Sequence, residues 1–212
     1  METTNGAKAP PLRSLTAPEG TKKGKNRNMK RKEIWKYIQS DYYRYSGQKL
    51  LPLKLFTKAV FSRNHCFRYS FWMRLANSGG IIGLFSKLMH RRYTLKYGIQ
   101  IPYTTKIGYG FYIGHGVGVV INGGTTIGNN VNISQFLSIG TNKRTPATIG
   151  DNVYIGPNVC VVEDVNIGSN TTIAAGAVVI KDIPENSTAA GCPAKVIGEN
   201  KHPEYVHNRW EL

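Results

Sequence analysis

A six-residue period from Ile101 to Pro184 constrains this chain more than any other feature. Isoleucine or valine opens almost every unit and glycine usually follows it, as in the consecutive units IGDNVY and IGPNVC. No helical period places one aliphatic residue at every sixth position, and β-branched residues disfavour a helix. The pattern predicts a solenoid of short strands that bend at glycine and asparagine, with the aliphatic residues stacked in one core.

The number of units sets the expected size of the solenoid. Thirteen units can be counted, and three make one triangular coil, so we expect about four coils. At about 4.8 Å per strand, the prism would be about 20 Å tall. The period slips twice, by two residues near Val119 and Val120 and by four within residues 141–148. The second slip is a polar, basic loop, and a loop that interrupts a regular repeat is a preferred location for function.

Positive charge is concentrated in the amino-terminal half. The 212 residues carry a net charge of +16. Residues 1–97 hold 21 Lys and Arg against 4 Asp and Glu, whereas residues 98–212 hold 7 against 8. A basic half indicates either solvated helix faces or an anionic neighbour, such as a membrane surface, a nucleic acid or a phosphorylated substrate. Because no nucleic-acid-binding motif occurs, we expect no nucleic acid partner.

Composition and apolar spacing divide the chain into four segments. These are a disordered basic tail, an α-helical region, the repeat domain and a C-terminal tail, at residues 1–28, 29–98, 99–198 and 199–212. The helical prediction rests on an apolar stripe through Ile34 and Ile38 and on Pro52, which can open a helix. We expect these helices either to cap the solenoid and contact partner subunits or to lie on an anionic membrane.

Cysteine usage and hydropathy indicate the compartment. The three cysteines are odd in number and lack the spacing of metal ligands, which favours a reduced, intracellular chain. No apolar stretch has the character of a secretory signal, and no apolar stretch is close in length to the roughly 20 residues that a membrane-spanning helix needs. We therefore expect a cytoplasmic protein, held at the inner face of the membrane if the basic helices bind lipid.

The repeats, the segment NSTAAGCPAKVIG and the single histidine of IGHGVG together resemble hexapeptide-repeat acyltransferases. The resemblance covers about residues 30–198 and extends to serine acetyltransferases and to related enzymes that O-acetylate sugars in polysaccharide pathways. It implies a mainly β fold, a left-handed parallel β-helix after an α-helical N-terminal region. It also implies a homotrimer, which could pair into a dimer of trimers, with active sites between neighbouring prisms. Acetyl-CoA is the implied co-substrate, and no metal is expected.

His115 is the one histidine of the repeat region and the predicted general base. It lies between Gly114 and Gly116, at a bend that would project the imidazole outward. By resemblance, it takes the proton of an acceptor hydroxyl as that oxygen attacks the thioester carbonyl of acetyl-CoA. A neutral imidazole has a suitable pKa for this step. A backbone N–H near Gly140 and Thr141 is the implied donor to the developing oxyanion.

Departures from the serine acetyltransferase pattern bear on the acceptor. Gln100 stands where those enzymes have an aspartate that orients the base, and Thr145 stands where they have a second active-site histidine. Gly114 replaces the acidic residue that receives the amino group of serine. Arg144 matches the arginine that meets the substrate carboxylate. Because the ammonium partner is lost, we predict a sugar or glycan hydroxyl as the acceptor, with serine as the alternative.

The resemblance also implies contacts with coenzyme A along the groove between subunits. Small residues would lie against the pantetheine arm and lysines near the nucleotide phosphates, namely Pro157, Ala174, Ala175, Lys181 and Lys195. Zinc hydration chemistry, which also occurs on this fold, needs three histidine ligands that one repeat-region histidine cannot supply. Two other functions stay open: N-acetylation of a nucleotide sugar, and a scaffold or binding module with no affinity for coenzyme A.

Overall fold

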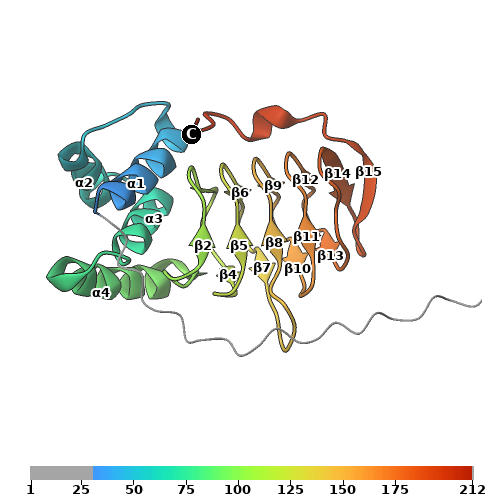
Figure 1. Ribbon diagram of the computed structural model, residues 1–212, viewed down its shortest axis with the longest axis horizontal. Helices are drawn as coiled ribbons and strands as arrows, with labels where there is room; N and C mark the ends of the chain where they lie inside the picture. Colours follow the sequence, from blue (N-terminus) through green and yellow to red (C-terminus); the bar gives the residue numbers. More distant parts are fainter. Residues whose placement is uncertain (1–30, 212) are drawn as a thin grey trace, which may run out of the picture.

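The computed structural model describes residues 31–211, in which four helices precede a parallel β-solenoid (Figure 1). The helices are α1 (Arg31–Ser46), α2 (Pro52–Phe61), α3 (His65–Leu75) and α4 (Gly80–Tyr97). The prediction of a mainly β solenoid after a helical region is confirmed. The disordered tail expected at residues 1–28 lies outside the described residues. No helix within residues 31–211 combines the length and the hydropathy that crossing a membrane requires.

Local residue chemistry explains where the helices begin and end. Pro52 opens α2 in the first turn, where its missing N–H would have had no helical partner. Asn64 caps α3, because its side chain accepts a hydrogen bond of 2.9 Å from the N–H of Phe67. Gly98 ends α4 in the left-handed conformation, with φ of 65°, and the chain passes directly into the first strand.

The solenoid consists of three parallel sheets that the chain visits in turn. Sheet A contains β1 (Ile99–Gln100), β4 (Val119–Ile121), β7 (Ser138–Ile139), β10 (Cys160–Val161) and β13 (Val178–Val179). Sheet B contains β2 (Lys106–Ile107), β5 (Thr126–Ile127), β8 (Thr148–Ile149) and β11 (Asn166–Ile167). Sheet C contains β3 (Tyr112–Ile113), β6 (Asn132–Ile133), β9 (Tyr154–Ile155), β12 (Thr172–Ile173), β14 (Ser187–Ala190) and the antiparallel β15 (Lys195–Glu199).

The stacked aliphatic core predicted from the repeat is present, but the solenoid is longer than expected. Buried isoleucines pair in register up each sheet, as Ile107, Ile127 and Ile149 do in sheet B. Sheet A has five strands, so the prediction of four coils was wrong. The count was short because the last repeat unit opens a fifth coil, which passes the bridge of Ile183 to Ile167 and continues beyond Pro184 into β14.

The two-residue slip that the sequence predicts near Val119 and Val120 lies directly before them, in the turn between β3 and β4. Ile113 pairs with Ile133 and Ile121 pairs with Ile139, so the connection from β3 to β4 is two residues longer than the one above it. Val120 itself is in register with Gln100 and Ser138. The extra residues therefore lengthen the turn that carries His115.

Two tyrosines from the helices complete the outer edge of the first coil. No coil precedes this edge, so its backbone groups need other partners. The hydroxyl of Tyr69 on α3 donates to the carbonyl of Ile101 and accepts from its N–H, both at 3.0 Å. The hydroxyl of Tyr45 on α1 makes the same pair of bonds to Ile113, also at 3.0 Å. His90 Nε2 lies 2.9 Å from the Tyr69 oxygen, and burial lowers the pKa of His90 to about 4.

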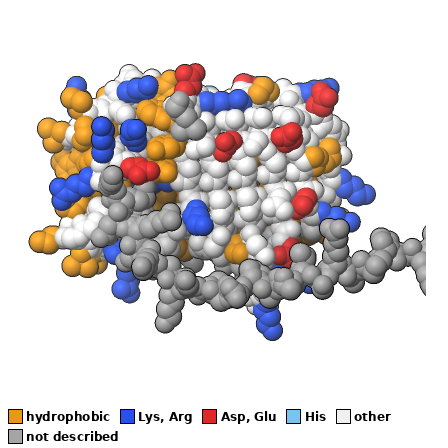
Figure 2. Space-filling model, viewed as in Figure 1, with side chains coloured by type: hydrophobic (Ala, Val, Ile, Leu, Met, Phe, Trp, Pro, Cys, Tyr) orange, Lys and Arg blue, Asp and Glu red, His pale blue; other side chains and the backbone are white. Residues whose placement is uncertain are grey.

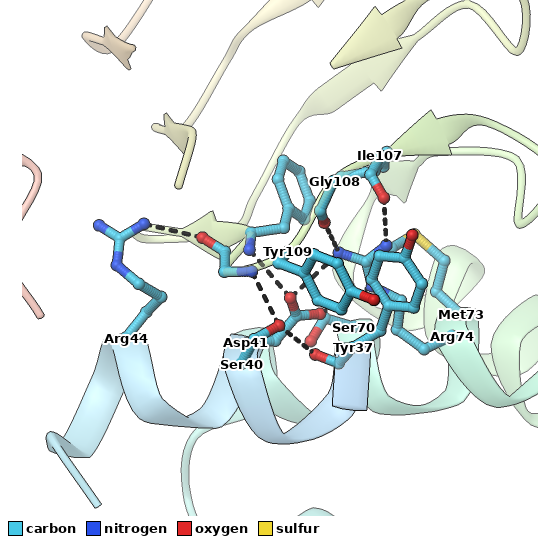
Figure 3. Close-up of polar contacts among 12 residues, drawn as sticks. Tyr37, Ser40, Asp41, Arg44, Ser70, Met73, Arg74, Ile107, Gly108 and Tyr109 are labelled. Atoms are coloured by element: carbon cyan, nitrogen blue, oxygen red, sulfur yellow. Dashed lines mark hydrogen bonds and ion pairs between the residues drawn. The ribbon is translucent and has the colours of Figure 1, made fainter. Parts of the chain in front are cut away.

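A buried ion pair completes the same edge next to sheet B (Figure 3). Arg74 on α3 donates to the carbonyls of Ile107 and Gly108, both at 2.7 Å. Its guanidinium also meets both carboxylate oxygens of Asp41 on α1, at 2.9 and 3.0 Å. Asp41 Oδ1 accepts a third bond, of 2.9 Å, from the N–H of Phe111. Burial raises the pKa of Asp41, and Arg74 opposes that rise.

The C-terminal segment runs back along the outside of sheet C toward α1 (Figure 1). After β15 it forms a short 3₁₀ helix, Pro203–Tyr205. Asn132 Nδ2 donates to the carbonyl of Tyr205 at 2.7 Å, and Asn130 exchanges two hydrogen bonds with the backbone of Trp210. Arg44 Nε on α1 donates to the carbonyl of His207 at 2.8 Å. The outer face of sheet C is therefore occupied by the chain's own tail.

Removing the buried carboxylate should destabilise the fold far more than removing an exposed one. Asp41→Ala leaves the Arg74 guanidinium buried without its counter-charge, and we expect the free energy of unfolding to fall by about 3–5 kcal/mol. Glu33→Ala, at an exposed position of the same helix, should change it by less than about 0.5 kcal/mol. Urea denaturation at one protein concentration measures both. Equal stability of the two variants would contradict the role assigned to this pair.

Candidate active site

His115 lies on an exposed, lengthened turn between β3 and β4. Its backbone is left-handed, with φ of 50°, a conformation that side-chain-bearing residues rarely adopt. Nonglycine residues held in this region cluster at functional sites, because surrounding structure must compensate for the strain. The imidazole is directed to the outside of the prism and not into the aliphatic core.

Helix α3 holds this turn from behind. The N–H of Gly116 donates to Cys66 Sγ over 3.1 Å. A Cβ atom on Gly116 would come within 2.8 Å of Ile99 Cδ1, 2.9 Å of Ile113 Cγ2 and 3.1 Å of Cys66 Sγ. Only glycine fits this close approach. Burial raises the pKa of the Cys66 thiol, which favours a neutral packing group at this position.

The predicted site residues gather around sheet A. The turns that lead from sheet C into sheet A form one edge of the prism, here called the C–A edge, and those from sheet A into sheet B form the A–B edge. The C–A edge carries His115, Pro157, Ala174 and Ala175. The A–B edge carries Gly140, Thr141, Arg144, Thr145 and Lys181. Within one protomer, sheet A separates His115 from the inserted loop.

The residue predicted to orient the base lies on sheet A itself. Gln100 is exposed at the end of β1, with its backbone paired to Val120. Among residues 31–211, no hydrogen bond joins the Gln100 amide to the imidazole of His115. Gly114, at the position of the missing acidic residue, donates its N–H to the carbonyl of Ile133 at 2.7 Å.

The backbone ladder selects between the two predicted oxyanion donors. The N–H of Gly140 donates to the carbonyl of Val161 at 3.1 Å, so it is used within the sheet. The N–H of Thr141 has no hydrogen-bond partner among the described residues. Thr141 is half-buried, and its hydroxyl donates to the carbonyl of Arg144 at 2.7 Å. Of the two groups, only the Thr141 N–H is available to a ligand.

Two carboxylates missed by sequence reasoning fix the inserted loop. Asp164 Oδ1 accepts from the N–H of Thr145 at 3.1 Å, and its Oδ2 lies 3.3 Å from Arg144 Nη1. Glu163 Oε2 accepts from the N–H of Asn142 at 2.8 Å. Both acids belong to the unit VVEDVN, where an acidic pair departs from the usual composition of the repeat. Exposed pairs of this kind add little stability, so their main effect is to set the loop's conformation.

Phe136 is a second feature that the sequence analysis missed. It occupies a left-handed position on the C–A edge, with φ of 59°, where the next two coils have Asn158 and Gly176. Phe136 is 52% exposed, and its ring packs so closely on Gly118 that a Cβ there would lie 2.6 Å from Phe136 Cδ1. An exposed aromatic ring therefore stands one coil above the turn of His115. The sequence signal for this feature is the unit ISQFLS, in which Phe stands where later units have Asn or Gly, the residue types that tolerate a left-handed backbone.

The residues expected to contact coenzyme A follow the same edges farther up the prism. Pro157 and Ala174 are half-buried, whereas Ala175 and Lys181 are exposed. Lys195 is exposed and directly follows the segment 191–194, which hydrogen-bonds to both backbone groups of Val178 at the end of sheet A. Within residues 31–211, no group of three or more His, Cys, Asp or Glu is placed to hold a metal ion.

Comparison with known proteins supports the resemblance predicted from the repeats. Residues 146–181 match the family described as bacterial transferase hexapeptide (six repeats). Serine acetyltransferase 4 of Arabidopsis thaliana is 37% identical over 120 residues, 54% of this chain and 34% of that protein. Serine acetyltransferase of Bacillus licheniformis is 41% identical over 108 residues, 49% of this chain and 50% of that protein. The chain thus spans half or less of the length of these two relatives.

Solved structures show the same likeness over more of the chain. The serine acetyltransferase of Neisseria gonorrhoeae in complex with serine aligns with a TM-score of 0.63 and 26% identity, over 79% of this chain and 70% of that one. The serine acetyltransferase of Brucella abortus in complex with coenzyme A aligns with a TM-score of 0.60 and 25% identity, over 78% and 66%. Fold and sequence together confirm the predicted resemblance to hexapeptide-repeat acyltransferases.

The packing of Gly116 gives a test of how the His115 turn is held. Gly116→Ala introduces a Cβ into the contacts with Ile99, Ile113 and Cys66, and we expect the free energy of unfolding to fall by about 1–3 kcal/mol. Gly140→Ala is the matched control, because nothing lies within 4 Å of a Cβ built there. Thermal and urea denaturation measure both variants. If Gly116→Ala were as stable as Gly140→Ala, the turn would not be packed as described.

Proposed function

We propose that the chain is an acetyl-CoA-dependent O-acetyltransferase in which His115 is the general base. The observation that carries this proposal is the exposed imidazole on a strained turn, held by α3 at the edge of a hexapeptide-type solenoid. The likeness to a serine acetyltransferase bound to coenzyme A supports acetyl-CoA as the co-substrate. A positioned base typically raises the reaction rate by about 10²–10⁴-fold, and we assign an effect of this size to the imidazole of His115.

The reaction follows from the groups on the two edges of sheet A. The acceptor hydroxyl loses its proton to the neutral imidazole of His115 as its oxygen attacks the thioester carbonyl carbon. The N–H of Thr141 donates to the carbonyl oxygen as negative charge develops there. Collapse of this intermediate breaks the carbon–sulfur bond, and the imidazolium returns the proton to the departing thiolate. The products are the O-acetyl ester and coenzyme A.

A site built in this way needs two protomers. The tail occupies sheet C, which leaves the faces of sheets A and B open to a neighbouring protomer. A three-fold arrangement can set the C–A edge of one protomer against the A–B edge of the next, which brings His115 to the neighbour's loop at 141–147. We therefore propose a homotrimer with each active site shared by two protomers.

We propose serine as the acceptor, in place of the sugar hydroxyl that the sequence favoured. The named relatives and structures are serine acetyltransferases, one of them in complex with serine. The argument for a sugar rested on Gly114, which removes one acidic residue. Glu163 and Asp164 lie beside the loop that carries Arg144, so the loss of an acidic residue at Gly114 does not leave this region without carboxylates.

Replacing the base provides the test. His115→Ala should lower kcat by about 10²–10⁴-fold with little change in the KM for acetyl-CoA, because the imidazole acts on the acceptor hydroxyl. His202→Ala, an exposed histidine of the tail, is the matched control and should keep full activity. Release of free thiol from acetyl-CoA measures the rate with L-serine, sugars and nucleotide sugars as acceptors.

Each outcome of this assay bears on a different part of the proposal. Thiol release with serine that is lost in His115→Ala supports both the base and the acceptor. Release with a sugar alone would overturn serine and restore the prediction made from Gly114. No release with any acceptor would overturn the enzymatic proposal and favour a scaffold, whereas full activity of His115→Ala would overturn the assignment of His115 as the general base.

A further inference from the structure

Helix α4 exposes its apolar face and buries its small, polar face, which is the reverse of an ordinary surface helix. Its outward stripe contains Ile81, Leu84, Leu88 and Leu95, exposed by 87%, 71%, 63% and 76%. These positions recur at helical spacing and so lie on one face. Its inward face is small and polar, with Gly83, Ser86 and His90 buried against the rest of the protein. Leucine and isoleucine outside, with glycine and serine inside, indicate that another surface covers α4.

Helix α2 and a groove extend this apolar surface. Leu53 and Phe61 of α2 are exposed, and Leu51 just before it is exposed as well. An apolar groove of about 450 Å³ lies between the helices, lined chiefly by aromatic and aliphatic side chains including Phe56 and Phe85. Figure 2 shows hydrophobic and basic side chains gathered over the helical end, whereas the solenoid is mostly covered by other residue types.

Cations flank the stripe, and no acidic residue occurs in either helix. Arg91, Arg92 and Lys96 are exposed on α4, and together with Leu88 and Leu95 they line a second, shallow hollow. Lys54 and Lys58 are exposed on α2. Neither α2 nor α4 contains Asp or Glu. A surface that is apolar along its centre and only cationic at its sides is complementary to a bilayer with anionic headgroups.

We propose that α2 and α4 form an interfacial docking surface for an anionic phospholipid membrane. Ile81, Leu84 and Leu88 enter the acyl boundary, while Arg91 and Arg92 contact lipid phosphates. The charge pattern selects this occupant over a second copy of the same surface, because two such surfaces would bring together the exposed Arg91, Arg92 and Lys96 of both copies, six cations without a carboxylate from either helix. The interaction is independent of the acetyltransferase chemistry and does not require a spanning helix.

Vesicle flotation tests the surface with the full-length protein. Vesicles of phosphatidylcholine with 30% phosphatidylglycerol are compared with pure phosphatidylcholine vesicles, at low and at high salt. Leu84→Gln/Leu88→Gln removes the centre of the stripe, and Arg91→Gln/Arg92→Gln removes two cations. Ile197→Gln/Lys201→Gln is the matched control, with both changes at exposed positions at the other end of the solenoid. Circular dichroism checks that each variant is folded.

We expect binding to the anionic vesicles alone, weakened by salt and reduced about tenfold or more in each α4 variant but not in the control. Absence of binding to anionic vesicles would overturn the proposal. Undiminished binding of the α4 variants would also overturn it, because another basic segment would then hold the lipid. The molar mass of each protein in solution is measured as well. If the unchanged protein bound no vesicles and Leu84→Gln/Leu88→Gln had a lower molar mass than the unchanged protein, the stripe would be an interface between copies of this chain.

Discussion

The structure depends on how the helices complete the open edge of the first coil. Every later coil finds its backbone partners in the coil before it, but the first has none. Tyr69 and Tyr45 each satisfy both backbone groups of one core isoleucine, in sheets A and C, and Arg74 satisfies two carbonyls beside sheet B. An unpaired buried backbone group costs about as much as a lost hydrogen bond, so these side chains allow the repeat to begin.

The same interactions position the candidate active site. Tyr45 on α1 hydrogen-bonds to Ile113, the last residue of β3, and Cys66 on α3 accepts from the N–H of Gly116. The two helices therefore contact the residues on both sides of His115. The left-handed backbone of His115 persists because its flanks are held in this way. The helical region therefore supports the candidate active site as well as capping the solenoid. Its outward face, on α2 and α4, is free for a different role.

The repeat made the solenoid predictable, since aliphatic residues at every sixth position can bury themselves only by stacking. Its interruptions located the inserted loop and the slip near Val119 and Val120, and His115 was identified separately as the one histidine of the repeat region. The contacts of the cap were not predictable in this way. Tyr69 bonds Ile101, and Arg44 bonds the carbonyl of His207 at the far end of the chain, and no local pattern encodes pairs so distant in sequence. Glu163 and Asp164 were visible as irregular residues, but their bonds to the loop require the coil geometry.

The central claim is that His115 and the loop at 141–147 act together across two protomers. Mixing subunits measures it directly: His115→Ala and Arg144→Ala/Thr145→Ala chains are unfolded together, refolded, and assayed for thiol release against each variant refolded alone. Sites shared between protomers predict recovered activity, because some mixed oligomers pair an intact histidine with an intact loop. Activity no higher than the average of the separate variants would contradict a shared site and place the whole reaction within one chain.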